Sequence, residues 1–250
     1  MARDAQAIER QDVDPARALY GSLVDPLQLV YPTNPLQISG LLHRIQEHAD
    51  LGGHVAIVDG AYDVPHDGHP WYLRSCRVEA TRARVGEAFD EASPRVQIGM
   101  VASEQTMLIV TLDADAKVAA NKSGAEKGGI SRPVYPWESR ANRIAGYMIP
   151  DGNLKYRPTV DVVTVEGDPM HAETPLASHI SFGESLSALG VLGTWLVYGE
   201  HSKAAEAATR IAGPDVVRIV PQSSVDVIDP RTGRKWSSSD IITRMKGENV

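Results

Sequence analysis

The sequence predicts an α/β fold: a Rossmann-like, doubly wound parallel sheet in three layers, with an N-terminal extension. Short apolar runs alternate with helical stretches along most of the chain, and this alternation is typical of βαβ units. Right-handed crossovers between such units give a parallel sheet that binds ligands at the carboxyl ends of its strands. The 250 residues suffice for one large core. We therefore expect a proline-rich extension over residues 1–37 and one domain over residues 38–250.

Apolar spacing and glycine mark the first elements of this domain. Apolar residues recur at helical spacing over Ile38–Ile45, and the two glycines at 52–53 end this helix. The apolar run His54–Val58 then predicts a buried parallel strand that ends in a tight loop. The same alternation predicts the later elements, which are a helix over His69–Ala88, a strand over Met107–Leu112, a helix over Pro136–Met148, strands over Val160–Val165 and Trp195–Tyr198, a helix over Ser202–Ala212, a strand over Val216–Val220 and a helix over Ser238–Lys246. Two loops, Asn121–Val134 and Gly167–Gly183, are longer than ordinary connections and indicate functional loops.

Charge and composition restrict the classes of function. The chain has 25 basic and 32 acidic residues, a net charge of -7, and no run of Lys or Arg, so a nucleic-acid partner is not expected. Cys76 is the only cysteine, which excludes an internal disulfide and a cysteine-based zinc site. There is no apolar leader and no stretch of about 18 apolar residues. We therefore expect a cytoplasmic protein without a membrane span. A homodimer is the assembly we consider.

A pair of histidines follows the first strand. The segment Gly60–His69 carries His66 and His69 on either side of Gly68, at the N-terminus of the next helix. Free backbone N–H groups and the helix dipole favour anions there, and Gly68 lets a polyphosphate approach the backbone. Paired imidazoles can stabilise charge on the bridging and leaving oxygens of a phosphoryl transfer. The alternatives are a His-x-x-His metal pair and two structural histidines. Since no Cys or His cluster lies nearby to complete a metal shell, we assign no metal-ligating residue.

This segment resembles the G-x-F-D-x-x-H-x-G-H signature of cytidylyltransferases and related adenylyltransferases, with Tyr62 in place of Phe. The resemblance implies that His66 and His69 stabilise a pentacoordinate transition state and that the preceding loop contacts the nucleotide. It assigns Asp63 to substrate as well. The nucleotide-binding candidates in this segment are Gly60, Ala61, Tyr62, Asp63 and Gly68.

Three serines near the C-terminus precede an Ile-Ile helical run. Their hydroxyls can cap that helix and also donate to a phosphate at its N-terminus, and an ordinary helix cap is the alternative. The segment Trp236–Met245 resembles the I-S-T-S/T-D-I-I-x-R-I segment of the same family, and Arg231 resembles the arginine of the R-T-E-G lead-in. The resemblance implies nucleotide contacts for Arg231, Ser237, Ser238 and Ser239, with Arg234 as the second choice for the arginine.

The middle of the chain completes the resemblance. The stretch from Leu108 to Arg140 resembles the L-I-V-x-x-x-x-D, K-G and R-P-x-x-P-x-x-x-R segments of bacterial sugar-phosphate nucleotidyltransferases, including heptose-1-phosphate adenylyltransferase. The resemblance assigns Lys122 to the phosphates as a catalytic residue, on a flexible loop where a point charge can follow a moving phosphate. It assigns Arg140 to substrate binding, on the nucleotide or the acceptor side. A solvated loop lysine is the alternative for Lys122, and Lys117 and Lys127 are its competitors.

The resemblance covers about residues 38–148 and 195–246 and implies a nucleotidyltransferase. Such an enzyme joins a nucleoside monophosphate from CTP or ATP to a phosphorylated small molecule and releases pyrophosphate, with Mg²⁺ bridging the triphosphate. The serine-led segment resembles CTP-using enzymes, whereas the helix from Ile38 and the central loop resemble ATP-using sugar-phosphate enzymes. Of the two nucleotides we expect CTP. The segment Asp168–Gly193 has no counterpart in the family and is expected to select the acceptor. The alternatives are a nucleotide-binding regulatory protein that has lost the chemistry and, given the acidic balance, more remotely an aminoacylating enzyme.

Overall fold

The computed structural model describes residues 29–30, 35–64, 66–103, 105–122, 131–150, 156–165, 194–198, 217–221, 228 and 233–234. Four groups of predictions lie outside these residues: most of the N-terminal extension, the acceptor segment at 168–193, the helices expected at 202–212 and 238–246, and the phosphate-binding candidates Arg231, Ser237, Ser238 and Ser239. Among the described helices, none combines the length and the apolar character that crossing a bilayer requires.

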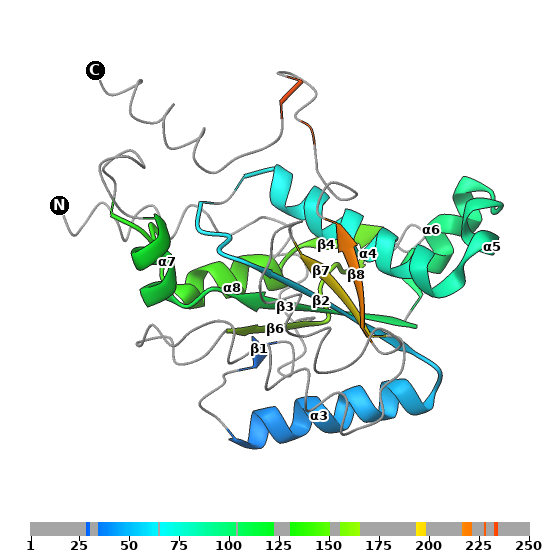
Figure 1. Ribbon diagram of the computed structural model, residues 1–250, viewed down its shortest axis with the longest axis horizontal. Helices are drawn as coiled ribbons and strands as arrows, with labels where there is room; N and C mark the ends of the chain where they lie inside the picture. Colours follow the sequence, from blue (N-terminus) through cyan, green and yellow to red (C-terminus); the bar gives the residue numbers. More distant parts are fainter. Residues whose placement is uncertain are drawn as a thin grey trace.

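A six-stranded, fully parallel sheet forms the centre of the described fold (Figure 1). Its strands stand in the order β1-β6-β3-β2-β7-β8. The bounds are β1 Leu29–Val30, β2 His54–Gly60, β3 Thr106–Leu112, β6 Val162–Val165, β7 Thr194–Tyr198 and β8 Val217–Pro221. Counted from β2, the five longer strands stand third, second, first, fourth and fifth, which is the Rossmann order. The predicted α/β, doubly wound parallel fold is confirmed.

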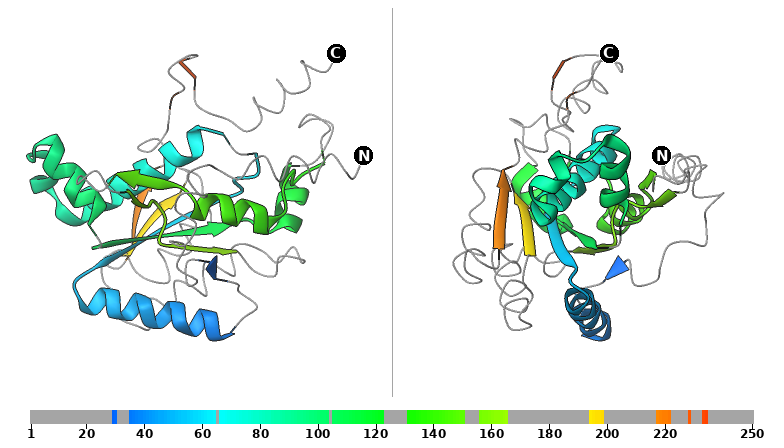
Figure 2. Two further views of the ribbon diagram at one scale, coloured as in Figure 1. Left: turned by 180° about the vertical axis from the view of Figure 1, so that it is seen from behind. Right: turned by 90° about the vertical axis from the view of Figure 1, so that its right-hand side faces the viewer.

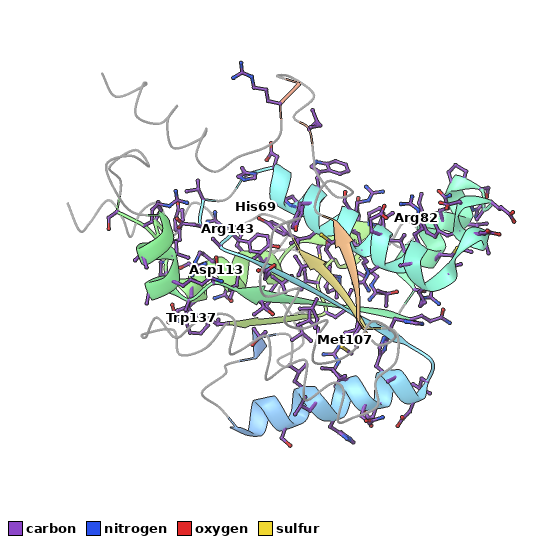
Figure 3. The ribbon with its side chains drawn as sticks, in the orientation of Figure 1. His69, Arg82, Met107, Asp113, Trp137 and Arg143 are labelled. Carbon is purple, nitrogen blue, oxygen red and sulfur yellow. The ribbon has the colours of Figure 1, made fainter. Side chains whose placement is uncertain are left out.

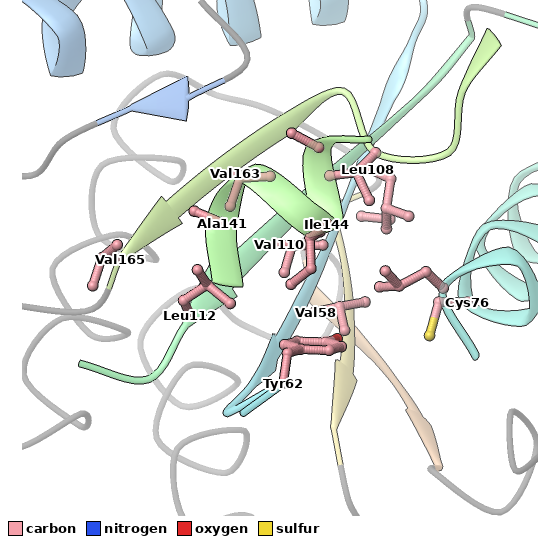
Figure 4. Packing of buried hydrophobic residues seen from close by; sticks show 14 of the residues in the cluster. Val58, Tyr62, Cys76, Leu108, Val110, Leu112, Ala141, Ile144, Val163 and Val165 are labelled. Atoms are coloured by element: carbon pink, nitrogen blue, oxygen red, sulfur yellow. The ribbon is translucent and has the colours of Figure 1, made fainter. Parts of the chain in front are cut away.

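Helices cover both faces of this sheet and make the three layers (Figures 1 and 2). Helix α3 (Pro35–Asp50) lies on one face, and α4 (Gly68–Val85) and α8 (Trp137–Ala145) lie on the other. On the second face, Val58, Val110 and Val163 pack against Cys76 of α4 and Ala141 and Ile144 of α8 (Figure 4). Strands buried on both faces read as continuous apolar runs, and this explains why β2 and β3 were predicted to within two residues.

Several boundaries differ from the predictions. The predicted helix over His69–Ala88 is broken at Gly86, whose φ of 71° lies in the left-handed region, and α5 (Glu87–Asp90) follows as a separate short helix. Helix α8 ends at Ala145, and Met148 belongs instead to β4 (Met148–Pro150), which pairs antiparallel with β5 (Tyr156–Pro158). At the start of the domain, α3 begins at Pro35 and β1 joins the sheet, so the extension expected over 1–37 supplies part of the fold.

Two helices lie where none was predicted. Helix α6 (Pro94–Ala102) follows α5, with Ser93 as its N-cap residue and a proline at its start. Helix α7 (Asp115–Lys122) follows β3. Lys122 is therefore the last residue of a helix, whereas the sequence predicted it within a flexible loop. Local sequence gave little signal for α7 because it is only eight residues long and carries a short apolar stripe.

Candidate functional site

The histidine motif lies at the position where this topology opens a ligand crevice. Strand β2 lies between β3 and β7. On the β3 side the chain continues outward to β6, and on the β7 side it continues outward to β8, so the direction of winding reverses at β2. In an open α/β sheet, the carboxyl ends of the strands at such a switch point flank the ligand site. The segment after Gly60 leaves the sheet there and enters α4 (Figure 1). The predicted placement of the motif between a strand and a helix N-terminus is confirmed.

Tyr62 has the most unusual backbone in this segment. Its φ is 44°, in the left-handed region that costs a residue with a Cβ about 1–2 kcal/mol. Its ring lies over Gly60, where an added Cβ would come 2.9 Å from Cε2 of Tyr62. The observed reason for glycine at position 60 is therefore the close approach of Tyr62. The side chain of Tyr62 is 9% exposed, and burial raises the pKa of its hydroxyl well above the usual value, so the hydroxyl stays protonated.

The two histidines stand side by side at the start of α4. Their ring centroids are 3.8 Å apart with the planes tilted by 34°, and the ring of Tyr62 meets His69 edge-on at 5.2 Å. The backbone of His69 donates to the carbonyl of His66 at 3.0 Å. Gly68, the first residue of α4, donates its N–H to Nδ1 of His66 at 3.1 Å. Gly68 thus contributes to orienting His66.

The contact between Gly68 and His66 favours one tautomer of the neutral His66 ring. Because Nδ1 accepts a hydrogen bond, a neutral ring carries its proton on Nε2. Burial lowers the pKa of His66, and the nearby Asp67 raises it by less, so the ring is biased toward the neutral form. Two protonated imidazoles at 3.8 Å would also repel each other. The arrangement can therefore present an Nε2–H donor at a helix N-terminus.

Asp63 is buried and held by protein groups. Its side chain is fully buried, and one carboxylate oxygen accepts from Nε of Arg132. The other oxygen accepts from the backbone N–H groups of Val134 at 2.6 Å and Tyr135 at 3.3 Å. Three donors thus occupy the carboxylate that the sequence assigned to substrate. That assignment stays a prediction, whereas the observed contacts join the motif loop to the segment before α8.

Arg140 is likewise buried, at 2% exposure. One end of its guanidinium donates to the carbonyl of Ala61, and the other donates at 2.7 Å to both the carbonyl of Asp113 and the carboxylate of Asp115. Arg140 thus links the carboxyl ends of β2 and β3 to α8. Its predicted contact with substrate remains a prediction, and in this structure it contacts the loop that carries the motif.

The candidate lysines are separated by the structure. Lys117 forms an ion pair with Asp113, its i−4 neighbour, and its side chain is only 16% exposed. Lys122 ends α7, and its side chain lies outside the described residues. Lys117 is paired with Asp113 in this structure and Lys127 lies outside the described residues, so the choice of Lys122 stays a prediction. Figure 3 labels His69, Asp113 and Arg143 among the side chains of the described residues.

Sequence reasoning missed three of the residues that build this end of the sheet. Arg132 stood in a recognised segment without a role, and neither Asp113 nor Asp115 was given one. A usable signal was present, because a charged residue next to the end of an apolar strand needs a partner once it is buried. In the part of the chain that the structure describes, no group of three or more His, Cys, Asp or Glu side chains could hold a metal ion.

No family model matches the sequence, and no curated protein matches it. Among solved structures, the chain is similar to a lipopolysaccharide core biosynthesis protein from Thermoplasma volcanium GSS1, at 19% identity and a TM-score of 0.32, over 67% of this chain and 93% of that one. A likeness at this level carries no argument about function, so the fold class follows from the strand order and register of the chain itself.

Proposed function

We propose that this chain is a nucleotidyltransferase that moves a nucleoside monophosphate from CTP or ATP to a phosphorylated small molecule and releases pyrophosphate. The single observation that carries the proposal is the pair His66 and His69, stacked at 3.8 Å at the N-terminus of α4. This pair follows the strand beside the topological switch point. Anionic ligands are favoured at that position because the positive end of the helix dipole points toward it.

The proposed reaction is an in-line displacement at the α-phosphorus. An oxygen of the acceptor phosphate forms a bond to this phosphorus, and the bond to the β-phosphate bridging oxygen breaks. Pyrophosphate leaves with that bonding pair, and negative charge builds on the oxygens around phosphorus. Neutral His66 donates from Nε2 to one of these oxygens, and His69 acts beside it. Donors that are already oriented need no reorganisation at the moment of reaction, so they stabilise the transition state more than the ground state.

Other groups complete the proposed site. Lys122 neutralises the departing phosphates, and Arg231 with Ser237, Ser238 and Ser239 binds the nucleotide. Mg²⁺ is expected to enter with the triphosphate, since the described residues offer no acidic cage and the carboxylate of Asp63 is occupied by three donors. The metal then supplies charge neutralisation on the phosphate oxygens.

The substrates are proposed as classes. CTP is favoured over ATP by the likeness of the serine segment to cytidylyltransferases. The acceptor is a sugar, polyol or alcohol phosphate, and the segment Asp168–Gly193 is proposed to select it. Thermal-shift titrations with Mg-CTP and Mg-ATP separate the two nucleotides. Replacing 168–193 by a short Gly/Ser linker should raise the acceptor KM while calorimetric nucleotide binding persists.

A pyrophosphate-release assay tests the function directly. The full chain is incubated with Mg²⁺, each of the four nucleoside triphosphates and a panel of phosphorylated sugars, polyols and alcohols. Acceptor-dependent release with one nucleotide supports the proposal, provided that His66→Ala lowers its rate by about 10²-fold or more and Asp90→Asn, a surface change in α5, leaves it unchanged. Tight nucleotide binding without pyrophosphate for any acceptor would favour the regulatory alternative.

A further inference from the structure

Two buried arginines, Arg140 and Arg132, bind the loop that carries the histidine motif, one on each side of Tyr62. On one side, the carbonyl of Ala61 accepts from Arg140, which is 2% exposed. On the other side, the carboxylate of Asp63 accepts from Arg132 and from the backbone N–H groups of residues 134 and 135. The residue between these two anchors has a φ of 44°. A non-glycine residue keeps such a conformation only where its surroundings over-determine it.

Tyr62, the residue between these two anchors, contacts one of the two histidines directly. The ring of Tyr62 meets the ring of His69 edge-on at a centroid distance of 5.2 Å, and His69 stacks on His66 at 3.8 Å. A continuous run of contacts therefore joins Asp63 to the two imidazoles. Arg132 and two N–H groups already take three of the roughly four acceptor sites of this carboxylate, and its side chain is fully buried, so its observed partners are all protein groups.

We propose that Asp63 and Arg132 form a clamp that positions His66 and His69 for nucleotidyl transfer, and that neither side chain contacts substrate. The inference rests on the proposed function. It assigns Asp63 a different role from the substrate ligand that sequence comparison suggests. Arg140 is the second anchor of the same loop. The clamp acts on the angle and position of the imidazoles, and a displacement of about 1 Å at a reacting centre can cost roughly 10²-fold in rate.

The kinetic test uses charge-matched pairs of variants. Asp63→Asn keeps an oxygen for the two backbone N–H groups and removes the negative charge opposite Arg132. Arg132→Gln removes the positive charge of the same ion pair. Asp90→Asn and Arg82→Gln make the same changes in an ion pair on the surface of α4 and α5, where Arg82 is 40% exposed. We expect the clamp variants to lower kcat by about 10-fold or more with KM for nucleotide and acceptor within about 3-fold, and the surface variants to change neither.

The double variant separates a clamp from two independent ligands. If Asp63 and Arg132 act as one unit, the combined loss in kcat should be close to the larger single loss. If the two single losses in kcat multiply in the double variant and the KM values rise, each side chain binds substrate independently. That result would contradict the clamp proposal. Where Asp63→Asn fails to fold, Arg132→Lys provides the comparison, because it keeps the charge and loses the planar fork of donors.

A ligand-free measurement keeps this inference separate from the proposed function. Imidazole ¹⁵N–¹H spectra of the full chain report the position and tautomer of His66 and His69 without substrate. Asp63→Asn and Arg132→Gln should shift the signals of both rings, whereas Arg82→Gln should leave them in place. Unchanged ring signals in both clamp variants would overturn the clamp. A wild-type chain that releases no pyrophosphate would overturn the transferase proposal alone.

Discussion

The two ends of the sheet each contain a buried arginine, and the two differ in what they hold. At the amino ends of the strands, Arg77 of α4 is 0% exposed and donates to the carbonyls of Val101, Thr106 and Thr159 and to the carboxylate of Asp161. All three of its nitrogens are used. At the carboxyl ends, Arg140 also combines two carbonyls with a carboxylate, but its Nε has no partner among the described residues.

This difference separates stability from positioning. Arg77 ties α4 to the end of α6 and to the ends of β3 and β6, and none of its partners belongs to the motif. Arg140 and the Asp63–Arg132 pair instead hold a loop whose central residue has a left-handed backbone. A buried arginine whose hydrogen bonds are all formed is expected where the fold needs only stability. A loop held in a strained backbone conformation is expected where side chains must be positioned for function.

The largest expected effect is the loss of the amino-end hub. Arg77→Met removes a buried charge, leaves three carbonyls without their arginine donor and takes one of three donors from Asp161, so we expect a loss of about 3–5 kcal/mol in the free energy of unfolding. Urea denaturation measures it. Arg74→Met, a change of the same type on the outer side of α4 where Arg74 lies over Trp71, should cost less than about 1 kcal/mol. Equal losses for both variants would contradict the role of Arg77 as a buried hub.

The second effect is on chemistry at the carboxyl end. His66→Ala and His69→Ala should each lower kcat by about 10²-fold or more while nucleotide affinity changes little, because the imidazoles act on charge that develops in the transition state. Steady-state pyrophosphate release and calorimetry with the nucleotide measure the two quantities. Turnover close to wild type in both variants would contradict the assignment of the motif.

The carboxyl end also shows how far sequence alone reaches. The positions of β2, β3 and the start of α4 were predictable because apolar runs and glycines report on local structure. The motif was recognised because its residues are consecutive. The partners of Asp63 were not predictable, because Arg132 and the N–H groups of 134–135 lie about 70 positions away and buried charges pair through the fold.

The roles of glycine and arginine show the same limit. Gly60 was assigned to nucleotide binding from the motif, whereas the structure gives it a steric reason in the ring of Tyr62. Gly86 was read as an ordinary helical position, although its left-handed φ breaks the helix. Arg140 was assigned to substrate, whereas its contacts are with Ala61, Asp113 and Asp115. Local sequence identifies such residues as important without specifying the partner.

A smaller effect is expected at Tyr62. Its hydroxyl is buried and has no hydrogen-bond partner among the described residues. Tyr62→Phe keeps the ring beside His69 and over Gly60 and removes the unsatisfied hydroxyl, so we expect an unchanged kcat and a gain in stability of up to about 1 kcal/mol. Thermal denaturation measures the gain. A loss of stability would show that the hydroxyl is bonded in solution.

The smallest effect is the pH dependence that His66 gives to stability. Its pKa is lowered in the fold by burial, so below the ordinary histidine value of about 6.5 the unfolded chain takes up the proton before the folded chain does. The contribution of a neutral His66 is therefore fully present above about pH 6.5, and it decreases as the pH falls toward the lowered value. His66→Gln should flatten this part of the stability profile, measured by urea denaturation at a series of pH values.

The charge of Asp67 provides a second test of this pH dependence. Its charge raises the pKa of His66 and so opposes the effect of burial. Asp67→Asn should move the folded pKa of His66 further from the unfolded value, and the decrease in stability should then continue to lower pH than in the wild type. In the His66→Gln background, Asp67→Asn should lose this influence, because the group on which it acts is gone. A profile that Asp67→Asn changes equally in both backgrounds would assign the acid sensitivity of the carboxyl end to Asp67 itself and not to the buried imidazole.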